Sequence, residues 1–353
     1  MSKNGNADAS IPILNGSIRI PESYVFDRVH AEPEEVVLVS GTLIEGIGNI
    51  HSDLDIYVIV NELPLASSFD IASHVTVCDE NDEILTPDQG DTEVGSTYDY
   101  YGDSGLHVDV KYITYAEVSR IFETIRWDFG ETIVDKKLDY PTVRSSLAKE
   151  QEKFVHRLQH GIALTNPEKY EALKAECPVA EYCFLLYRQF SPNYFTFKDV
   201  QGTWQAGQLP MAREIARGLV VGHMQSITHL NQNSNKTSKW IFEYVDQLPD
   251  WATETRHRFL EFVAMGASNE QESRAYVLAA MDLMDKIFAT GVGLMRLQPL
   301  YPSPEDCMKH LDAALDLRND TQHLLSQHAY QFRAKNFRVS EAPLSALVDI
   351  GNA

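Results

Sequence analysis

The sequence predicts an α+β protein in which a small mixed-sheet domain precedes a larger all-helical domain. Short runs rich in β-branched residues and bounded by turn residues fill the chain up to about residue 115. Beyond Thr114, apolar residues recur every three or four positions with charged residues between them, which is the spacing of amphipathic helices. The chain has 353 residues, and this length also favours two domains.

Three segments follow from this change of pattern. Residues 1–20 are small and polar, and we expect them to form a flexible lead. Residues 21–115 form the sheet domain, and residues 116–353 form the helical domain.

The expected strands lie at 36–39, 54–60 and 106–113, and a further candidate lies at 74–77. The first two are continuous apolar runs that end at turn residues, and the third alternates apolar and polar residues. Residues 79–105 are rich in Asp, Glu, Gly and Ser and are expected to form a long loop.

The helical spacing continues to the C-terminal part of the chain, and an expected loop at 191–210, which holds Ser191-Pro192, interrupts it. The expected helices are 115–126, 142–164, 167–190, 209–231, 236–247, 254–265, 270–296 and 305–331.

The formal net charge of −21, from 51 acidic and 30 basic residues, repels phosphate backbones, so no DNA partner is expected. A small or cationic partner suits this surface better than RNA. No apolar run reaches the length of a membrane span, and the polar start lacks the apolar core of a signal peptide. We therefore expect a cytoplasmic protein whose four scattered cysteines are reduced and pack in the core.

The most informative motif is Gly41-Thr42, then ten residues, then Asp53-Leu54-Asp55 at the start of an expected strand. Strand periodicity places Asp53 and Asp55 on one face, roughly 6.5–7 Å apart along the backbone. Their carboxylates can converge on one hard cation, which takes oxygen ligands. Glycines in the loop allow backbone N–H groups to approach phosphate oxygens.

The third acid of the motif is Asp109, in the expected strand 106–113. Three carboxylates on adjacent strands can hold two Mg²⁺ ions, one on a triphosphate and one on the attacking hydroxyl. The sequence therefore predicts a metal site made by Asp53, Asp55 and Asp109.

This arrangement resembles the polymerase-β-like nucleotidyltransferase superfamily, and within it the minimal and antibiotic-modifying branch. The resemblance covers about residues 36–113. It implies transfer of NMP from an NTP, with Mg²⁺ and release of pyrophosphate. Gly41 and Thr42 would contact phosphate, Asp53 and Asp55 would form the metal pair, and Asp109 would be the third carboxylate.

Residues flanking the motif both extend the resemblance and depart from it. Ser52, before the acid pair, matches the family and is counted with the nucleotide-binding residues. Thr42 replaces the usual serine but keeps the hydroxyl, whereas Glu45 stands where many relatives carry a basic residue.

A weaker similarity lies between Asn231 and Trp240. Related enzymes often place a Lys-Trp pair on a helix of the second domain, and here Lys239 would face the triphosphate, with Lys236 as its alternate. A lysine there would stabilise charge on the leaving pyrophosphate. The alternative is a solvated lysine beside a core tryptophan.

Other polar side chains have both a functional and a structural interpretation. A salt bridge from Lys111 to Asp109 is the main rival to metal binding, and His107 would share their strand face. The remaining candidates are His51 as a phosphate contact, the Tyr98-Tyr100-Tyr101 cluster as a stacking surface, and Arg213 with Arg217 as a phosphate-binding pair.

The first functional hypothesis is a Mg²⁺-dependent enzyme that moves NMP from an NTP, with ATP expected, to a hydroxyl or phosphate of a small molecule. The acceptor could be an antibiotic or a biosynthetic intermediate. The second hypothesis makes the acceptor a protein or a tRNA end, and the third is a catalytically silent nucleotide-binding protein on the same fold.

Overall fold

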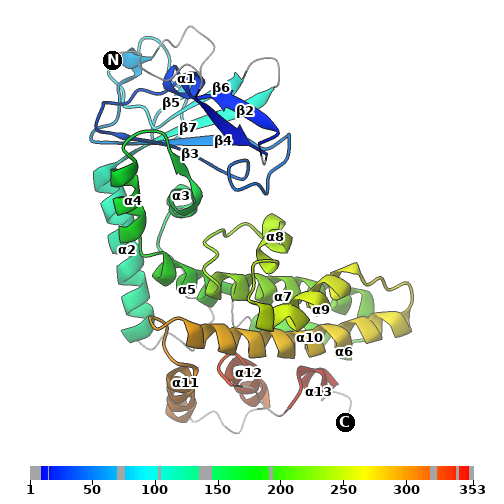
Figure 1. Ribbon diagram of the computed structural model, residues 1–353. Coiled ribbons are helices and arrows are strands. Elements are labelled where there is room, and N and C mark those ends of the chain that lie inside the picture. Colours follow the sequence, from blue (N-terminus) through cyan, green and yellow to red (C-terminus); the bar gives the residue numbers. More distant parts are fainter. Residues whose placement is uncertain are drawn as a thin grey trace. The chain divides into compact units, whose positions relative to one another are not determined.

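The computed structural model describes residues 9–14, 16–69, 76–101, 105–134, 145–190, 194–318, 324–338 and 342–349. The chain divides into two compact units (Figure 1). Unit 1 comprises Met1–Glu123 and Leu147–Cys177, and unit 2 comprises Thr124–Ser146 and Pro178–Ala353. Unit 1 contains a mixed sheet and unit 2 is built from helices, so the predicted α+β class is confirmed.

The main sheet of unit 1 has the strand order β5-β6-β7-β4-β3-β8. Neighbouring strands are antiparallel except β4 and β7, which are parallel. The strands are β3 (Val36–Ser40), β4 (Leu54–Val60), β5 (Thr76–Cys78), β6 (Ser96–Tyr101), β7 (Leu106–Thr114) and β8 (Ile162–Ala163).

The two strands that carry the acidic residues differ in burial. β4 is almost wholly buried after its first two residues, as expected of a central strand in a mixed sheet. β7 alternates: Val108 and Val110 enter the core of unit 1, whereas Asp109 and Lys111 lie on the opposite face. The expected strands at 36–39, 54–60 and 106–113 are thus confirmed. Of the candidate at 74–77, residues 74 and 75 lie outside the described residues, and β5 covers the rest.

From residue 10 onward, the segment expected to be a flexible lead instead forms regular secondary structure. β1 (Ser10–Ile13) and β2 (Ile18–Pro21) pair as an antiparallel two-stranded sheet, and the short helix α1 (Glu22–Phe26) follows. Ile11, Ile13 and Ile20 are buried in the core of unit 1, and this burial orders a segment whose polar composition suggested mobility. Residues 1–8 and 15 of the expected lead lie outside the described residues.

A segment after the expected boundary at residue 115 belongs with the sheet. It contains α3 (Lys149–His160), β8 and α4 (Pro167–Glu176), and β8 pairs with β3. Gly161 ends α3 against the sheet: a Cβ there would lie 2.6 Å from Leu38 Cδ1 and 3.1 Å from the Val39 carbonyl oxygen. The lack of a side chain lets the chain turn from helix to strand, where continuous helical spacing predicted one helix over 142–164.

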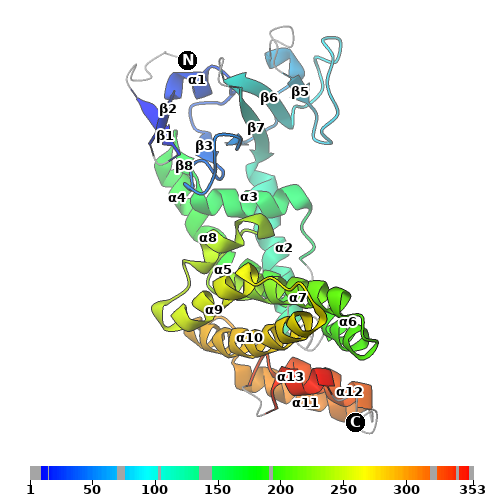
Figure 2. The same ribbon diagram turned by 90° about the vertical axis from the view of Figure 1, so that its right-hand side faces the viewer.

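Unit 2 is organised around two long helices, α7 (Leu209–Leu230) and α10 (Glu270–Leu297), which pack along each other (Figure 2). Gly291 of α10 permits close approach, since a Cβ there would lie 3.3 Å from Ile227 Cγ2 of α7. Asn269 caps α10 by accepting a hydrogen bond from the Glu272 N–H. None of the helices in the described part of the chain combines the length and apolar character needed to cross a membrane.

The remaining helical elements follow in chain order. α2 (Tyr115–Val134) begins in unit 1 and ends in unit 2. Next come α5 (Val179–Phe190), α6 (Tyr194–Gln205), α7 (Leu209–Leu230), α8 (Ile241–Val245), α9 (Thr253–Ala264), α10 (Glu270–Leu297), α11 (Pro304–Arg318), α12 (Leu324–Ala334) and α13 (Leu344–Asp349). Single 3₁₀ turns are η1 (Ala66–Ser68), η4 (Ser238–Trp240) and η5 (Asp250–Ala252).

Other expectations also differ from the structure. The expected helix 167–190 is two helices, α4 and α5, because Pro178 cannot donate a helical hydrogen bond. The expected loop 191–210 contains α6, and the expected loop 79–105 contains β6, which is stabilised by pairing with both β5 and β7. Tertiary packing and strand pairing overrode the local polar composition in these segments.

Candidate metal centre

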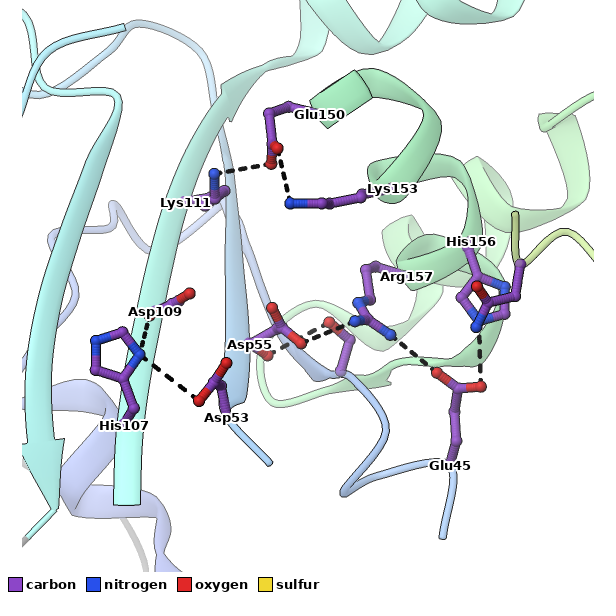
Figure 3. A network of polar contacts seen from close by, with 12 residues as sticks. Glu45, Asp53, Asp55, His107, Asp109, Lys111, Glu150, Lys153, His156 and Arg157 are labelled. Atoms are coloured by element: carbon purple, nitrogen blue, oxygen red, sulfur yellow. Dashed lines mark hydrogen bonds and ion pairs between the residues drawn. The ribbon is translucent and has the colours of Figure 1, made fainter. Parts of the chain in front are cut away.

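The predicted acidic residues come together at the start of β4 and in β7. The parallel register places Asp55 opposite Asp109, and Asp53 immediately precedes the first residue of β4. Alternation along β7 puts His107 on the same face as Asp109. The three acids are therefore neighbours, but their side chains do not form one cluster (Figure 3).

Asp53, His107 and Asp109 each offer one ligand atom, and these atoms lie within 4.8 Å of one another. His107 Nδ1 is 2.8 Å from Asp109 Oδ1 and 3.7 Å from Asp53 Oδ1. Asp109 Oδ1 is buried, and its close contact with His107 does not have the geometry of a hydrogen bond, so it has no hydrogen-bond partner. A buried carboxylate oxygen left in this way is costly unless a ligand contacts it.

The pKa values of Asp109 and Asp55 also indicate that their negative charges are not fully compensated. Burial raises the pKa of Asp109 to about 6 against the opposing charge of His107, and the nearby Asp55 and Asp53 add to the rise. Burial also raises the pKa of Asp55, although Arg157 acts in the opposite direction. The protein alone thus does not compensate the negative charge at Asp109 fully, and a cation would favour its ionised form.

The donor set fits one divalent cation. Neighbouring ligands of an octahedral ion bound at about 2.1 Å are about 3.0 Å apart, and the two distances from His107 Nδ1 bracket that value. Asp53 is about half exposed (55%), so the cluster opens to solvent on that side. Asp53, His107 and Asp109 would hold the ion.

Asp55 has a different partner. Its Oδ2 lies 3.1 Å from Arg157 Nη2, and Arg157 Nη1 lies 3.0 Å from Glu45 Oε1. The other Glu45 oxygen, Oε2, is 3.1 Å from His156 Nε2. We call Glu45, Asp55, His156 and Arg157 the arginine network (Figure 3). Asp55 thus pairs with a guanidinium from α3 rather than lying in the cluster of Asp53 and Asp109. Its expected metal contact stays a prediction.

Glu45 anchors this network in the loop between β3 and β4. Its side chain is only 6% exposed, and burial alone would raise the pKa of its carboxyl. The hydrogen bond and charge of His156, with the charges of His160 and Arg157, outweigh burial and lower that pKa. Glu45, which departs from the family pattern, is thus the ionised group that holds Arg157 beside Asp55.

Gly41 is required by its surroundings. Its φ is +98°, in the region that favours glycine, and an added Cβ would lie 2.3 Å from Asp55 Oδ2. The turn that follows uses its own N–H groups: those of Ile44 and Glu45 donate to the Gly41 carbonyl, and those of Ile47 and Gly48 donate to the Thr42 carbonyl. These four N–H groups bond within the loop, and Gly41 and Thr42 supply the carbonyl oxygens that accept them. The phosphate contacts expected of Gly41 and Thr42 stay predictions.

The residues just before β4 form a turn of their own. Ser52 Oγ accepts a hydrogen bond from the Asn49 N–H at 3.0 Å, and the His51 N–H donates to Asn49 Oδ1 at 2.9 Å. This turn directs the chain into Asp53 and β4. It gives Ser52 and His51 structural contacts, and the predicted nucleotide contact of Ser52 is left as a prediction.

The rival salt bridge to Asp109 does not form. Lys111 Nζ is instead 2.9 Å from Glu150 Oε2 on α3. Tyr98 stacks on the His107 ring, with centroids 6.0 Å apart and planes 11° apart, and Tyr100 contacts the same ring at 5.2 Å. Part of the tyrosine cluster therefore packs against His107 of the candidate metal centre.

The predicted basic residues of the helical region lie in unit 2. Lys239 is exposed on η4, and its ammonium lies 5.1 Å from the ring centroid of Trp240, which is half-buried rather than in the core. Arg213 donates to the Ala267 carbonyl and pairs with Glu214. Their phosphate-binding roles stay predictions.

Sequence reasoning missed Arg157 and His156 and did not count His107 as a ligand. Alternation with Asp109 was the available signal for His107, since both lie on one strand face. Arg157 gave no comparable signal, because it contacts Glu45 across 112 residues of sequence.

No protein-family model matches the chain, and no curated protein sequence matches it. Among solved structures, the chain is similar to a nucleotidyltransferase-like protein from Exiguobacterium sibiricum 255-15. The identity is 12%, the TM-score is 0.35, and the match covers 79% of this chain and 78% of that one. A likeness of this extent carries no inference about activity, which has to come from the side chains of the metal centre.

Proposed function

We propose that this protein transfers a nucleoside monophosphate from an NTP, with ATP the expected donor, to a hydroxyl or phosphate of a small-molecule acceptor, with release of pyrophosphate. The observation that carries the proposal is the buried Oδ1 of Asp109, which has no hydrogen-bond partner and lies with Asp53 and His107 beside the parallel strands β4 and β7. The Gly41 turn beside Asp55 completes the motif.

The chain's own residues bind and orient the reactants in this proposal. A bound divalent cation would offset triphosphate charge and lower the pKa of the attacking hydroxyl. Asp53, which is open to solvent, is placed to meet a cation that arrives with the nucleotide, whereas Asp109 lies deeper. The expected second Mg²⁺ would require Asp55 to separate from Arg157.

The nature of the acceptor is proposed from charge. A net charge of −21 repels a polyanionic tRNA end and favours a small or cationic acceptor. A protein acceptor is compatible with the same charge, and the assay below separates it from the small molecule.

One observation favours a second candidate, a catalytically silent nucleotide-binding protein. Arg157 already neutralises Asp55, so one of the three expected metal carboxylates is engaged within the protein. A chain of this kind would bind NTP without releasing pyrophosphate.

The test incubates the protein with Mg²⁺ or Mn²⁺ and each labelled NTP, with and without a cell extract fractionated by size. Pyrophosphate release together with a labelled small product is expected. Label on protein or RNA would identify the macromolecular acceptor, and nucleotide binding without turnover would identify the silent protein.

Matched variants assign the activity to the metal centre. Asp53→Asn and Asp109→Asn each remove one charge at nearly constant volume and are expected to abolish release. Asp88→Asn makes the same change on an exposed turn and is expected to leave release unchanged. Full activity in Asp109→Asn would overturn the proposed role of this carboxylate.

A further inference from the structure

The candidate metal centre contains a nitrogen donor, which the three-aspartate prediction did not include. We infer that Asp53, His107 and Asp109 bind one first-row transition dication of the Mn²⁺ class, with His107 Nδ1 as a ligand, in preference to Mg²⁺. The inference deepens the proposed function and rests on it only for the role of the ion in transfer.

The geometry supports His107 as a ligand. Nδ1 is the ring atom that faces both acids, at 2.8 Å from Asp109 Oδ1 and 3.7 Å from Asp53 Oδ1 (Figure 3). The nearer oxygen is buried and accepts no hydrogen bond, so the close pair has the spacing of two ligands around an ion.

The imidazole is held in this orientation by packing. Tyr98 stacks on the ring and Tyr100 contacts it at a tilt, both from β6 beside the histidine's own strand. The ring is 32% exposed, so an ion can reach it from solvent. A ligand fixed before binding loses little freedom when it coordinates.

The arginine network explains why one ion is expected. Asp55 lies in register with Asp109, and a second ion would need its carboxylate. Arg157 occupies that carboxylate at 3.1 Å and is itself fixed by Glu45, so a permanent cation stands where a second metal charge would act.

Ligand chemistry then selects the ion. Mg²⁺ prefers oxygen ligands in near-ideal octahedral geometry and loses its water reluctantly. Imidazole nitrogen favours the first-row transition metals, and two carboxylates beside it suit Mn²⁺.

The experiment titrates the full-length protein with Mn²⁺ in the absence of nucleotide and counts bound ions by electron paramagnetic resonance. One ion per chain is expected, with a ¹⁴N coupling in pulsed spectra that becomes a ¹⁵N coupling after labelling of histidine. Displacement is expected to need an excess of Mg²⁺ over Mn²⁺.

Three variants identify the nitrogen. His107→Ala is expected to lose the coupling and to bind Mn²⁺ at least about tenfold more weakly, since loss of even an outer-shell partner of a metal ligand costs that much. His107→Asp keeps a ligand and is expected to bind Mn²⁺ without the coupling. His51→Ala removes an exposed histidine from the nearby turn and is expected to behave as wild type. Thermal unfolding without metal verifies that each variant is folded.

A nitrogen coupling that persists in His107→Ala, two equivalent ions per chain, or no binding without nucleotide would overturn the inference. The outcome is separable from that of the proposed function. Binding through His107 without pyrophosphate release would refute nucleotidyl transfer and leave the ion site standing, and release without this site would do the reverse.

Discussion

The two carboxylates of the Asp53-Leu54-Asp55 motif lie in contrasting surroundings. Asp55 is 23% exposed and paired with Arg157, in a network that Glu45 and His156 close. Asp53 is 55% exposed and faces His107 and a buried oxygen of Asp109 that has no hydrogen-bond partner. One carboxylate of the motif is paired with a guanidinium of the protein itself, and the other lies in the candidate metal centre.

The comparison teaches that spacing alone does not assign a role to an acid pair. Strand periodicity puts both residues on one face, but the charge that approaches each carboxylate decides whether it stabilises the fold or binds a ligand. An internal ion pair strengthens the folded state only while both partners are present, whereas an uncompensated carboxylate lowers stability until an ion binds.

The largest expected effect on stability comes from breaking the ion pair between Asp55 and Arg157. Arg157→Met leaves Glu45 and Asp55 without their shared cation and is expected to lower the free energy of unfolding by about 3–5 kcal/mol. Urea denaturation at pH 7 measures the loss. Lys153→Met is the control: it removes a cation from the exposed Glu150 pair and is expected to cost less than about 1 kcal/mol. If the two variants lost equal free energies of unfolding, the pair between Asp55 and Arg157 would be no more important to stability than an exposed ion pair.

Removing a charge from the candidate metal centre, which contains Asp109, is expected to raise the free energy of unfolding rather than lower it. The pKa of Asp109 is raised to about 6, so the ion-free protein binds more protons folded than unfolded and loses stability as pH rises from about 4 to about 6. Asp109→Asn removes this penalty and is expected to raise the free energy of unfolding at pH 7 by on the order of 1–3 kcal/mol.

Urea denaturation of wild type and Asp109→Asn across this pH range tests the sign. The difference between the two proteins is expected to grow with pH, and added Mn²⁺ is expected to stabilise only the wild type. A variant less stable than wild type at pH 7 would mean that Asp109 has a purely structural role.

The backbone of Gly41 lies directly beside the carboxylate of Asp55. Gly41→Ala combines a φ of +98° with a Cβ that would lie 2.3 Å from the Asp55 carboxylate, so about 1–3 kcal/mol of stability is expected to be lost. Gly130→Ala is the matched control, because that glycine lies within α2 with open space around it and is expected to gain up to about 1 kcal/mol. Thermal unfolding compares them, and a neutral Gly41→Ala would show that the loop can move away from Asp55.

The smallest expected effect concerns Lys239 in unit 2. Lys239→Ala removes an exposed ammonium, so stability is expected to change by less than about 0.5 kcal/mol. If the lysine faces the triphosphate, the KM for NTP rises while folding is unaffected. Lys236→Ala tests the alternate lysine in the same assay. An unchanged KM in both variants would confine nucleotide binding to other residues.

The sequence by itself determined the α+β class, the strands at the motif and the presence of acids on neighbouring strands. These are local properties: the apolar runs ending at Gly41 and beginning at Leu54 specify strands, and alternation sets the face of Asp109. His107 was accessible by the same rule, since it lies two residues before Asp109 on that face.

Only the tertiary structure decided what each acid contacts. Arg157 and His156 come from a helix more than 100 residues after Glu45, and β8, which follows that helix, pairs with β3. The placement of such a charge depends on packing of the whole unit, because many residues in a helix have a similar local pattern and few reach a given carboxylate. Local periodicity therefore locates the acids, and long-range packing determines which of them is neutralised within the protein.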